Sequence, residues 1–237
     1  MIAVEKTVGE IAREIPSAVR VFEKHGIDYC CGGRTTLEQA CGERGLAVER
    51  LVADLEAAAS PSAAAERDWN AAPLAELTDH IVKTHHAYLR TELPRLDEML
   101  GKVLDAHGAK YAYLSRLRDV FDGLCDELGS HMMKEEMVLF PSIVRLEMAR
   151  RAGSPPPPTP FGSFRNPIGM MEFEHDSAAQ ALGQMRELSS DYSAPEDACN
   201  TFLALYQGLA ELETDLHRHI HKENNILHPR AIELESL

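Results

Sequence analysis

Residues 130–141 read SHMMKEEMVLFP, and residues 218–229 read RHIHKENNILHP. Each stretch places a glutamate four residues after a histidine and then continues through apolar residues to a proline. The pairs are His131 with Glu135, and His219 with Glu223. Because residues four apart lie on the same face of an α-helix, both side chains of a pair can reach a common point. The matched stretches predict an internal repeat of one helix design.

The rest of the chain also favours helices over strands. Apolar residues recur at three- and four-residue intervals, and no sustained apolar–polar alternation is present. Four long helical patterns are predicted, over residues 73–106, 111–150, 166–190 and 195–227. Pro94 predicts a kink within the first pattern, because apolar spacing continues beyond it. The sequence therefore predicts an all-α fold with an antiparallel four-helix bundle over residues 73–237.

Four histidines recur at a nearly constant interval. His86, His131, His175 and His219 follow one another after 45, 44 and 44 residues. In an up-down-up-down bundle, such an interval brings residues to one level of the interior. His85 competes with His86 on spacing alone, and we choose His86 because it shares an apolar stripe with Val82, Leu89 and Leu93.

These four histidines, with Glu135 and Glu223, supply enough ligands for two metal ions if each carboxylate bridges both. Imidazoles with bridging carboxylates suit iron or manganese, and remaining coordination positions would accept dioxygen, peroxide or nitric oxide. A single such pair is often only a solvated helix face, but two matched pairs at one interval favour a metal site. Glu136 and Glu174 are candidates for hydrogen bonds to the ligands, and a plain surface role is an equal alternative.

Other side chains receive simpler interpretations. His221 is expected outside the core, since it lies two residues from His219 and faces away from it. The methionines at 132, 133, 137, 170 and 171 are expected to pack flexibly in the core rather than to bind metal.

Residues 1–58 predict a small helical domain, followed by a linker over residues 59–72. Thr7 and Ser17 are placed as caps of its first two helices, Gly26 ends the second, and the third begins at Thr36. The turn between the second and third helices contains the stretch GIDYCCGGR at residues 26–34.

Cys30 and Cys31 are adjacent in this turn. Neighbouring Cα atoms lie about 3.8 Å apart, closer than an unstrained disulfide prefers, so we expect two thiols. Gly32 and Gly33 could present amides to a thiolate, and Arg34 could lower a thiol pKa. The alternative is that the pair consists of two small buried residues with no chemical role.

The charge balance excludes some functions. Asp and Glu number 38 against 24 Lys and Arg, giving a net charge of −14 at pH 7. Nucleic acids and anionic membranes require a basic patch, so we expect neither as a partner. The N-terminus does not resemble a signal peptide, and no apolar run approaches the roughly 18–20 residues of a membrane span. We therefore expect a cytoplasmic protein.

The combination of DYCCGG, SHMMKEE, EHD and a final ENN four residues after a histidine closely resembles the repair-of-iron-centres (RIC) family. The resemblance covers residues 5 to 232 and implies a hemerythrin-like bundle with two non-haem iron ions, carboxylate- and oxo-bridged. On this sequence it implies terminal ligands His86, His131, His175 and His219 and bridging ligands Glu135 and Glu223. Cys30 and Cys31 match the family's cysteine pair, whereas His85 and His228 are local departures.

The resemblance implies a protein that repairs iron–sulfur clusters damaged by nitric oxide or oxidative stress by donating iron. Its expected partners are damaged iron–sulfur proteins and small ligands such as nitric oxide or dioxygen, and a homodimer stays open. Cys30 and Cys31 are the candidate reactive residues, and iron donation is favoured over classical enzyme catalysis. Two alternatives remain, a carrier or sensor of dioxygen or nitric oxide and a reductase of nitric oxide or peroxide.

Overall fold

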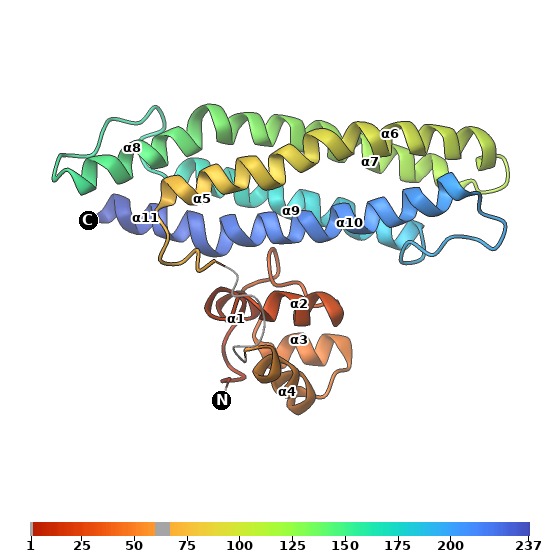
Figure 1. Ribbon diagram of the computed structural model, residues 1–237, viewed down its shortest axis with the longest axis horizontal. Coiled ribbons are helices and arrows are strands. Elements are labelled where there is room, and N and C mark those ends of the chain that lie inside the picture. The colour runs from red at the N-terminus through yellow and green to blue at the C-terminus, as the bar shows by residue number, and fades with distance from the viewer. Residues whose placement is uncertain (1, 60–66) are drawn as a thin grey trace. The chain divides into compact units, whose positions relative to one another are not determined.

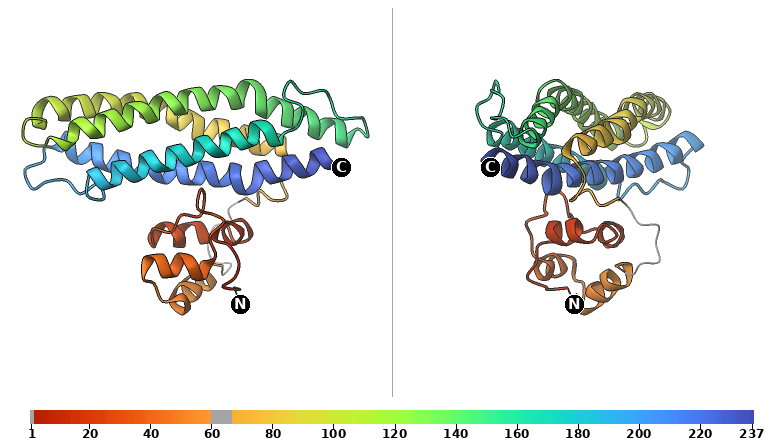
Figure 2. Two further views of the ribbon diagram at one scale, coloured as in Figure 1. Left: turned by 180° about the vertical axis from the view of Figure 1, so that it is seen from behind. Right: turned by 60° about the vertical axis from the view of Figure 1, so that its left-hand side comes forward.

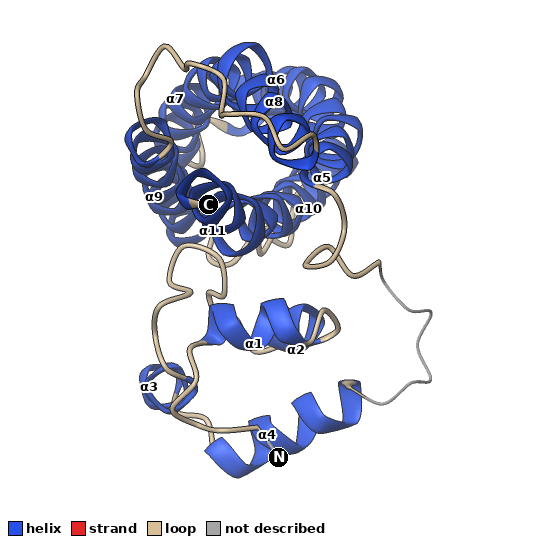
Figure 3. Cartoon of the chain, turned by 90° about the vertical axis from the view of Figure 1, so that its left-hand side faces the viewer, coloured by secondary structure: helices blue, strands red, loops and turns tan. Residues whose placement is uncertain are grey.

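The computed structural model describes residues 2–59 and 67–237. It contains two compact units, Met1–Leu77 with His217–Leu237, and Thr78–Leu216. Within the described ranges the regular structure is helical and no strand forms, which confirms the predicted all-α class (Figure 3). The predicted domain limits stay a prediction, and most of the linker predicted at 59–72 lies outside the described residues.

The unit Thr78–Leu216 contains the core of a helical bundle. Its principal helices are α6 (Ala87–His107), α7 (Tyr113–Lys134), α9 (Arg165–Leu188) and α10 (Asn200–Lys222), the last of which continues into the other unit. These helices lie side by side and alternate in direction, as Figures 1 and 2 show. Pro94 lies inside α6, which continues through it as the apolar spacing predicted.

Apolar side chains at three- and four-residue spacing fill the bundle interior. The fully buried members of this core include Leu89, Leu96, Leu100, Leu117, Phe121, Leu182, Leu205, Leu209 and Leu212. The same spacing led to the predicted helices, because one stripe of each helix must leave water to fold. Polar contacts, such as the hydrogen bond from Tyr206 to Tyr113 at 3.0 Å, add to this packing.

The methionine prediction is correct for only part of the set. Met132 and Met171 are buried, whereas Met133, Met137 and Met170 are mostly exposed. Adjacent helical residues point about 100° apart, so Met133 and Met170 cannot share the inner face with their buried neighbours.

Three π-helical segments interrupt long helices in the described ranges. They are η1 (Val82–His86) between α5 (Leu74–Ile81) and α6, η2 (Glu135–Leu139) between α7 and α8 (Phe140–Arg151), and η3 (Glu223–Leu227) between α10 and α11 (His228–Ser236). Each closes with an N–H bonded to the carbonyl five residues back, such as Phe140 to Glu135. One extra residue per turn rotates the following helix face, and such segments often occur at functional sites.

Two boundaries of the fourth predicted pattern, residues 195–227, differ from the structure. The helix begins later, at Asn200, because residues 190–192 take a left-handed backbone and a turn follows. It also extends through α11 to Ser236. Pro229 does not stop it, because this proline lies in the first turn of α11, where a missing N–H costs no helical bond.

The described N-terminal part of the other unit comprises α1 (Val8–Glu14), α2 (Ala18–Lys24), α3 (Leu37–Arg44) and α4 (Val48–Ala58). A capping box of Thr7 with Glu10 begins α1, as expected, and one of Thr36 with Gln39 begins α3. The predicted cap at Ser17 is wrong, since this residue has helical backbone angles and donates its hydroxyl hydrogen bond to the carbonyl of Ala58.

Candidate metal centre and cysteine turn

Glu135 is the buried carboxylate around which the histidines of the unit Thr78–Leu216 gather. Its Oε2 lies 3.3 Å from Nε2 of His86 and 3.4 Å from Nε2 of His131. The Nε2 of His175 in turn lies 3.1 Å from that of His131. All four side chains are almost completely buried, and Glu135 is 0% exposed. One carboxylate oxygen therefore lies between two imidazole nitrogens, with a third imidazole beside them.

The π-helical segments determine where these ligands point. His86 is the last residue of η1, and Glu135 is the first residue of η2. An extra residue in the turn changes the direction of the next side chains by about 100° relative to an uninterrupted helix. His131 and His175, by contrast, lie within the regular helices α7 and α9.

Two further carboxylates hold the outer nitrogens of these imidazoles. Nδ1 of His86 lies 2.7 Å from Glu136, and Nδ1 of His131 lies 2.9 Å from Glu174. A carboxylate at Nδ1 keeps the proton on that nitrogen and leaves the Nε2 lone pair directed inward. Both glutamates therefore orient the candidate ligands, and the surface alternative for them is wrong.

The cations next to these glutamates keep them ionised. Burial acts to raise the pKa of Glu136, but hydrogen bonds from His86 and Arg90 outweigh it, so the pKa is lowered. Burial likewise opposes ionisation of Glu174, and the hydrogen bonds from Lys134 and His131 lower its pKa overall.

The adjacent His85 and His86 have different partners. His86 faces Glu135, whereas Nδ1 of His85 lies 2.9 Å from Asp215. Both rings are buried, so exposure alone would not separate them. Of the two, His86 is the residue in contact with the central carboxylate.

The second sequence pair lies in the other unit. His219 is near the end of α10, and Glu223 begins η3. The Nε2 of His219 lies 3.0 Å from Oε1 of Glu223, and both side chains are buried. This pair repeats the relation of His131 to Glu135, with a histidine in a regular helix and a glutamate at the start of a π-helical segment.

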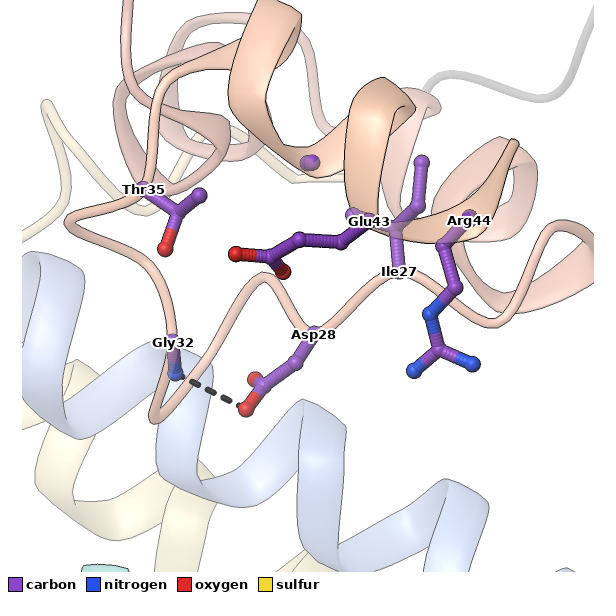
Figure 4. A pocket seen from close by; sticks show the side chains of 7 residues that line it. Ile27, Asp28, Gly32, Thr35, Glu43 and Arg44 are labelled. Carbon is purple, nitrogen blue, oxygen red and sulfur yellow. Dashed lines mark hydrogen bonds between the residues drawn. The ribbon is translucent and has the colours of Figure 1, made fainter. Parts of the chain in front are cut away.

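Asp28 organises the turn that contains the two cysteines. Its Oδ1 accepts hydrogen bonds from the backbone N–H groups of Cys30 and Cys31, each at 3.0 Å, and its Oδ2 accepts one from Gly32 at 2.8 Å. Figure 4 shows this carboxylate against the Gly32 amide, beside a pocket of about 50 Å³ that α3 residues Glu43 and Arg44 help to line. The two sulfurs lie 3.8 Å apart, and both cysteines are free thiols.

This arrangement corrects the expected activation of Cys30. The hydrogen bond to Cys31, burial and the nearby Asp28 all raise the pKa of Cys30 above its ordinary value. The hydrogen bond of the Gly32 amide is accepted by Asp28 rather than by a thiolate. Gly33 serves a packing purpose, since a Cβ there would lie 2.9 Å from the Tyr29 carbonyl oxygen.

The cysteine turn is anchored on the segment that also carries His219 and Glu223. The side-chain amide of Asn225 donates to the Tyr29 carbonyl at 3.1 Å, and Arg218 binds the Glu23 carboxylate through two 2.8 Å contacts. His221, expected outside the core, is buried with its ring centroid 5.4 Å from that of Tyr29. Burial lowers its pKa to about 3, so this imidazole is neutral.

Comparison with known proteins places this geometry in a family. Residues 77–231 match the model of the hemerythrin HHE cation-binding domain, and residues 4–59 match a domain of unknown function, DUF542. The chain is 41% identical over 233 residues to the iron–sulfur cluster repair protein YtfE of Musicola paradisiaca, covering 98% of both chains. It is 39% identical to the protein of that name from Escherichia coli O157:H7, over 96% of this chain and 97% of the relative. The chain belongs to the YtfE family of iron–sulfur cluster repair proteins. The resemblance to the repair-of-iron-centres family is thereby confirmed.

The donor set fits the cation expected in this family. Imidazole nitrogens and carboxylate oxygens are ordinary iron ligands, and a hemerythrin domain implies iron binding. A buried ionised carboxylate is costly unless a positive charge or several hydrogen bonds compensate for it. Within one unit, His131, Glu135 and His175 bring their ligand atoms within 4.8 Å of one another, which suits a shared cation.

Sequence reasoning missed two residues in this YtfE-family chain. Asp28 was not singled out as a functional residue. The available signal was its position at the start of a glycine-rich turn, where aspartate often accepts hydrogen bonds from the backbone amides that follow it. Asn225 is the second, since its side-chain amide donates to the Tyr29 carbonyl in the cysteine turn. No helix in the described ranges combines the length and apolarity needed to cross a membrane.

Proposed function

We propose that this chain repairs iron–sulfur clusters damaged by nitric oxide or oxidative stress by donating iron from a two-iron store. His86, His131, His175 and His219 would act as terminal ligands, and Glu135 and Glu223 as bridging carboxylates, with an oxo bridge between the irons. We also assign the chain to the cytoplasm, with damaged iron–sulfur proteins as its clients and nitric oxide or dioxygen as small ligands.

The observation that carries the proposal is the contact of one buried Glu135 oxygen with two imidazole nitrogens, at 3.3 and 3.4 Å. A carboxylate that bridges two metal ions needs histidines on both sides, so that each ion also has imidazole ligands. The His219–Glu223 pair repeats the same relation at the junction of α10 and η3, and the family match at residues 77–231 spans all six residues.

The protein groups around the iron would control how firmly it is held. Glu136 and Glu174 fix the imidazole orientation and increase its basicity, which strengthens binding. Histidine and carboxylate ligands must be deprotonated to bind, so protonation at this site favours release. When bound, the two irons supply redox-active metal that is held less firmly after reduction and can be passed on as cargo.

Cys30 and Cys31 would assist the transfer rather than hold the store. Asn225, on the helical stretch that carries His219 and Glu223, bonds their turn at Tyr29, and Arg218 on the same stretch bonds Glu23 of α2. A turn with two thiols, bonded to that stretch, is suited to bind nitric oxide, sulfur species or an iron ion that leaves the store. A simple dioxygen carrier has no use for such a pair, so this feature favours repair.

Iron content provides the first test. Glu135→Gln and Glu223→Gln are expected to reduce bound iron well below two per chain, measured by metal analysis with optical and Mössbauer spectra. Glu98→Gln is the matched control, because Glu98 is exposed and pairs only with Lys102 within its helix. Full iron loading in both site variants would reject the assigned ligands.

Reactivation of a damaged client separates repair from its alternatives. The iron-loaded, reduced protein is incubated with a dehydratase whose cluster has been damaged by nitric oxide, and enzyme recovery is compared with iron lost from the donor. Matched stoichiometry supports donation. Many turnovers of nitric oxide with iron retained support a reductase, and reversible ligand binding without client recovery supports a carrier or sensor.

A further inference from the structure

The cysteine turn brings three metal-type donors together outside the bundle. One carboxylate oxygen of Asp28, Cys30 Sγ and Cys31 Sγ all lie within 4.8 Å of one another. They come from four consecutive positions in the unit that contains α1 to α4, and none of them is among the six residues assigned to the iron store. Asp28 is exposed, Cys31 is half-buried and Cys30 is buried, so a cation could arrive from solvent.

The distances between these atoms match the edges of a small coordination polyhedron. Two thiolates bound at about 2.3 Å in a tetrahedral site lie about 3.8 Å apart. The two sulfurs are 3.8 Å apart, far beyond a covalent S–S bond. Cys30 Sγ also lies 3.2 Å from Asp28 Oδ1, close to the about 3.6 Å expected between a thiolate and a carboxylate oxygen on one tetrahedral ion.

The backbone of the turn holds the donors in place before any ion arrives. Three consecutive amides, from Cys30, Cys31 and Gly32, donate to the Asp28 carboxylate and fix its position relative to the sulfurs. Gly33 allows the chain to pass within 2.9 Å of the Tyr29 carbonyl oxygen, and the Asn225 amide bonds that same carbonyl. The donors therefore need little reorganisation to bind.

We propose that Asp28, Cys30 and Cys31 form a second metal site that binds one thiophilic divalent cation, such as Fe²⁺ or Zn²⁺. Binding forms two metal–sulfur bonds and one metal–oxygen bond, and each thiol releases its proton to solvent. No electron is transferred in this step. Water would occupy a fourth position, which suits an exchangeable ion rather than a permanent structural one.

This site goes beyond the proposed iron store and does not depend on it. Thiolate ligands select softer cations than the histidine and carboxylate donors of the bundle, so the two sites differ in chemistry as well as in position. If the bundle does donate iron, the two thiolates could bind the departing ion at a turn that Asn225 bonds to the helical stretch carrying His219 and Glu223.

Cobalt titration of the full-length reduced protein without oxygen tests the site. Thiolate-bound Co²⁺ has a near-ultraviolet sulfur-to-metal charge-transfer band, which Co²⁺ bound only by histidine and carboxylate lacks. We expect this band to saturate at one thiolate-bound Co²⁺ per chain, with one proton released from each of the two thiols. Absence of the band at excess Co²⁺ would overturn the proposal.

Variants assign the band to particular residues. The replacements Cys30→Ser and Cys31→Ser should each greatly weaken it, and Asp28→Asn should lower the Co²⁺ affinity. Cys199→Ser is the matched control, since Cys199 is an exposed thiol elsewhere, and it should leave the band unchanged. Cys31 is only half-buried, so its serine variant should keep the fold, and circular dichroism checks this. An unchanged band in Cys31→Ser would refute the assignment.

The bundle variant separates this inference from the iron store. Glu135→Gln protein should lose bundle iron and retain the full thiolate band. If Glu135→Gln instead abolishes the band, the sulfurs bind no independent ion and the inference is wrong. If iron loading survives in Glu135→Gln while the band also persists, the second site stands and the ligand assignment of the store is wrong.

Discussion

The carboxylate behind His86 allows a quantitative test of the proposed iron store. Glu136 accepts a 2.7 Å hydrogen bond from Nδ1 of His86, and Arg90 contacts the same oxygen at 2.6 Å. Glu136→Gln keeps an acceptor at this position but removes the negative charge. Glu136→Leu removes both the acceptor and the charge, and it leaves His86 Nδ1 without this partner.

The expected effect follows from the loss of this one contact. A hydrogen bond to a charged group contributes about 1.5–3 kcal/mol, and loss of a carboxylate behind a metal-bound imidazole typically weakens metal binding about 10–100-fold. We expect Glu136→Leu to fall in this range. Glu136→Gln should weaken binding by about 10-fold or less, because it can still accept from His86 and so preserve the ring orientation.

Chelator competition measures this effect. Iron dissociation constants are determined for the two variants and for the control Glu98→Gln, which removes an exposed carboxylate of α6. Thermal unfolding of the iron-free proteins checks that the fold is retained. Equal affinities in wild type and Glu136→Leu would refute the role of Glu136, as would a loss of the same size in Glu98→Gln.

Three other predictions concern stability and can be measured by chemical denaturation of the iron-free protein. Gly33→Ala should destabilise the fold by about 1–3 kcal/mol, because its Cβ would lie 2.9 Å from a backbone carbonyl oxygen. Gly183→Ala, which has open space around it in α9, should stabilise the fold by up to about 1 kcal/mol. Equal effects of the two replacements would contradict this reasoning. Phe121→Ala should cost about 3–5 kcal/mol because its ring is fully buried in the bundle core, and a loss below 1 kcal/mol would exclude that packing role. Arg218→Ala should cost only about 1 kcal/mol, because its paired contacts to Glu23 lie at a partly exposed surface; a much larger loss would show that this pair is essential for the unit.

The helices and the candidate ligands were predictable because the signal for them is local. Three- and four-residue spacing identified the long helices, and the nearly constant interval from His86 to His219 identified residues on a common level. Within one unit, His86, His131, Glu135 and His175 do lie together. A helix has a fixed period, so spacing along the chain predicts which residues share a face.

The errors arose where a polar group bonds a partner that its residue type does not specify, whether that partner is distant or near along the chain. Ser17 has the residue type of a helix cap, but its hydroxyl donates its hydrogen bond to the Ala58 carbonyl. The glycines after Cys31 suggested amides that stabilise a thiolate, but the Gly32 amide donates its hydrogen bond to Asp28. A hydrogen bond goes to the partner that the fold brings nearest, which residue type alone does not specify.

The sequence by itself determined the all-helical class, the positions of the long helices and the family, because each depends on short-range periodicity or on motif identity. The tertiary structure decided which of two adjacent histidines meets Glu135, which glutamates support the imidazoles, and how Asp28 and the two sulfurs are arranged. The π-helical segments turn side chains away from the directions a regular period predicts, and the supporting partners lie up to 50 residues away along the chain. Only folding brings such groups within hydrogen-bonding distance of one another.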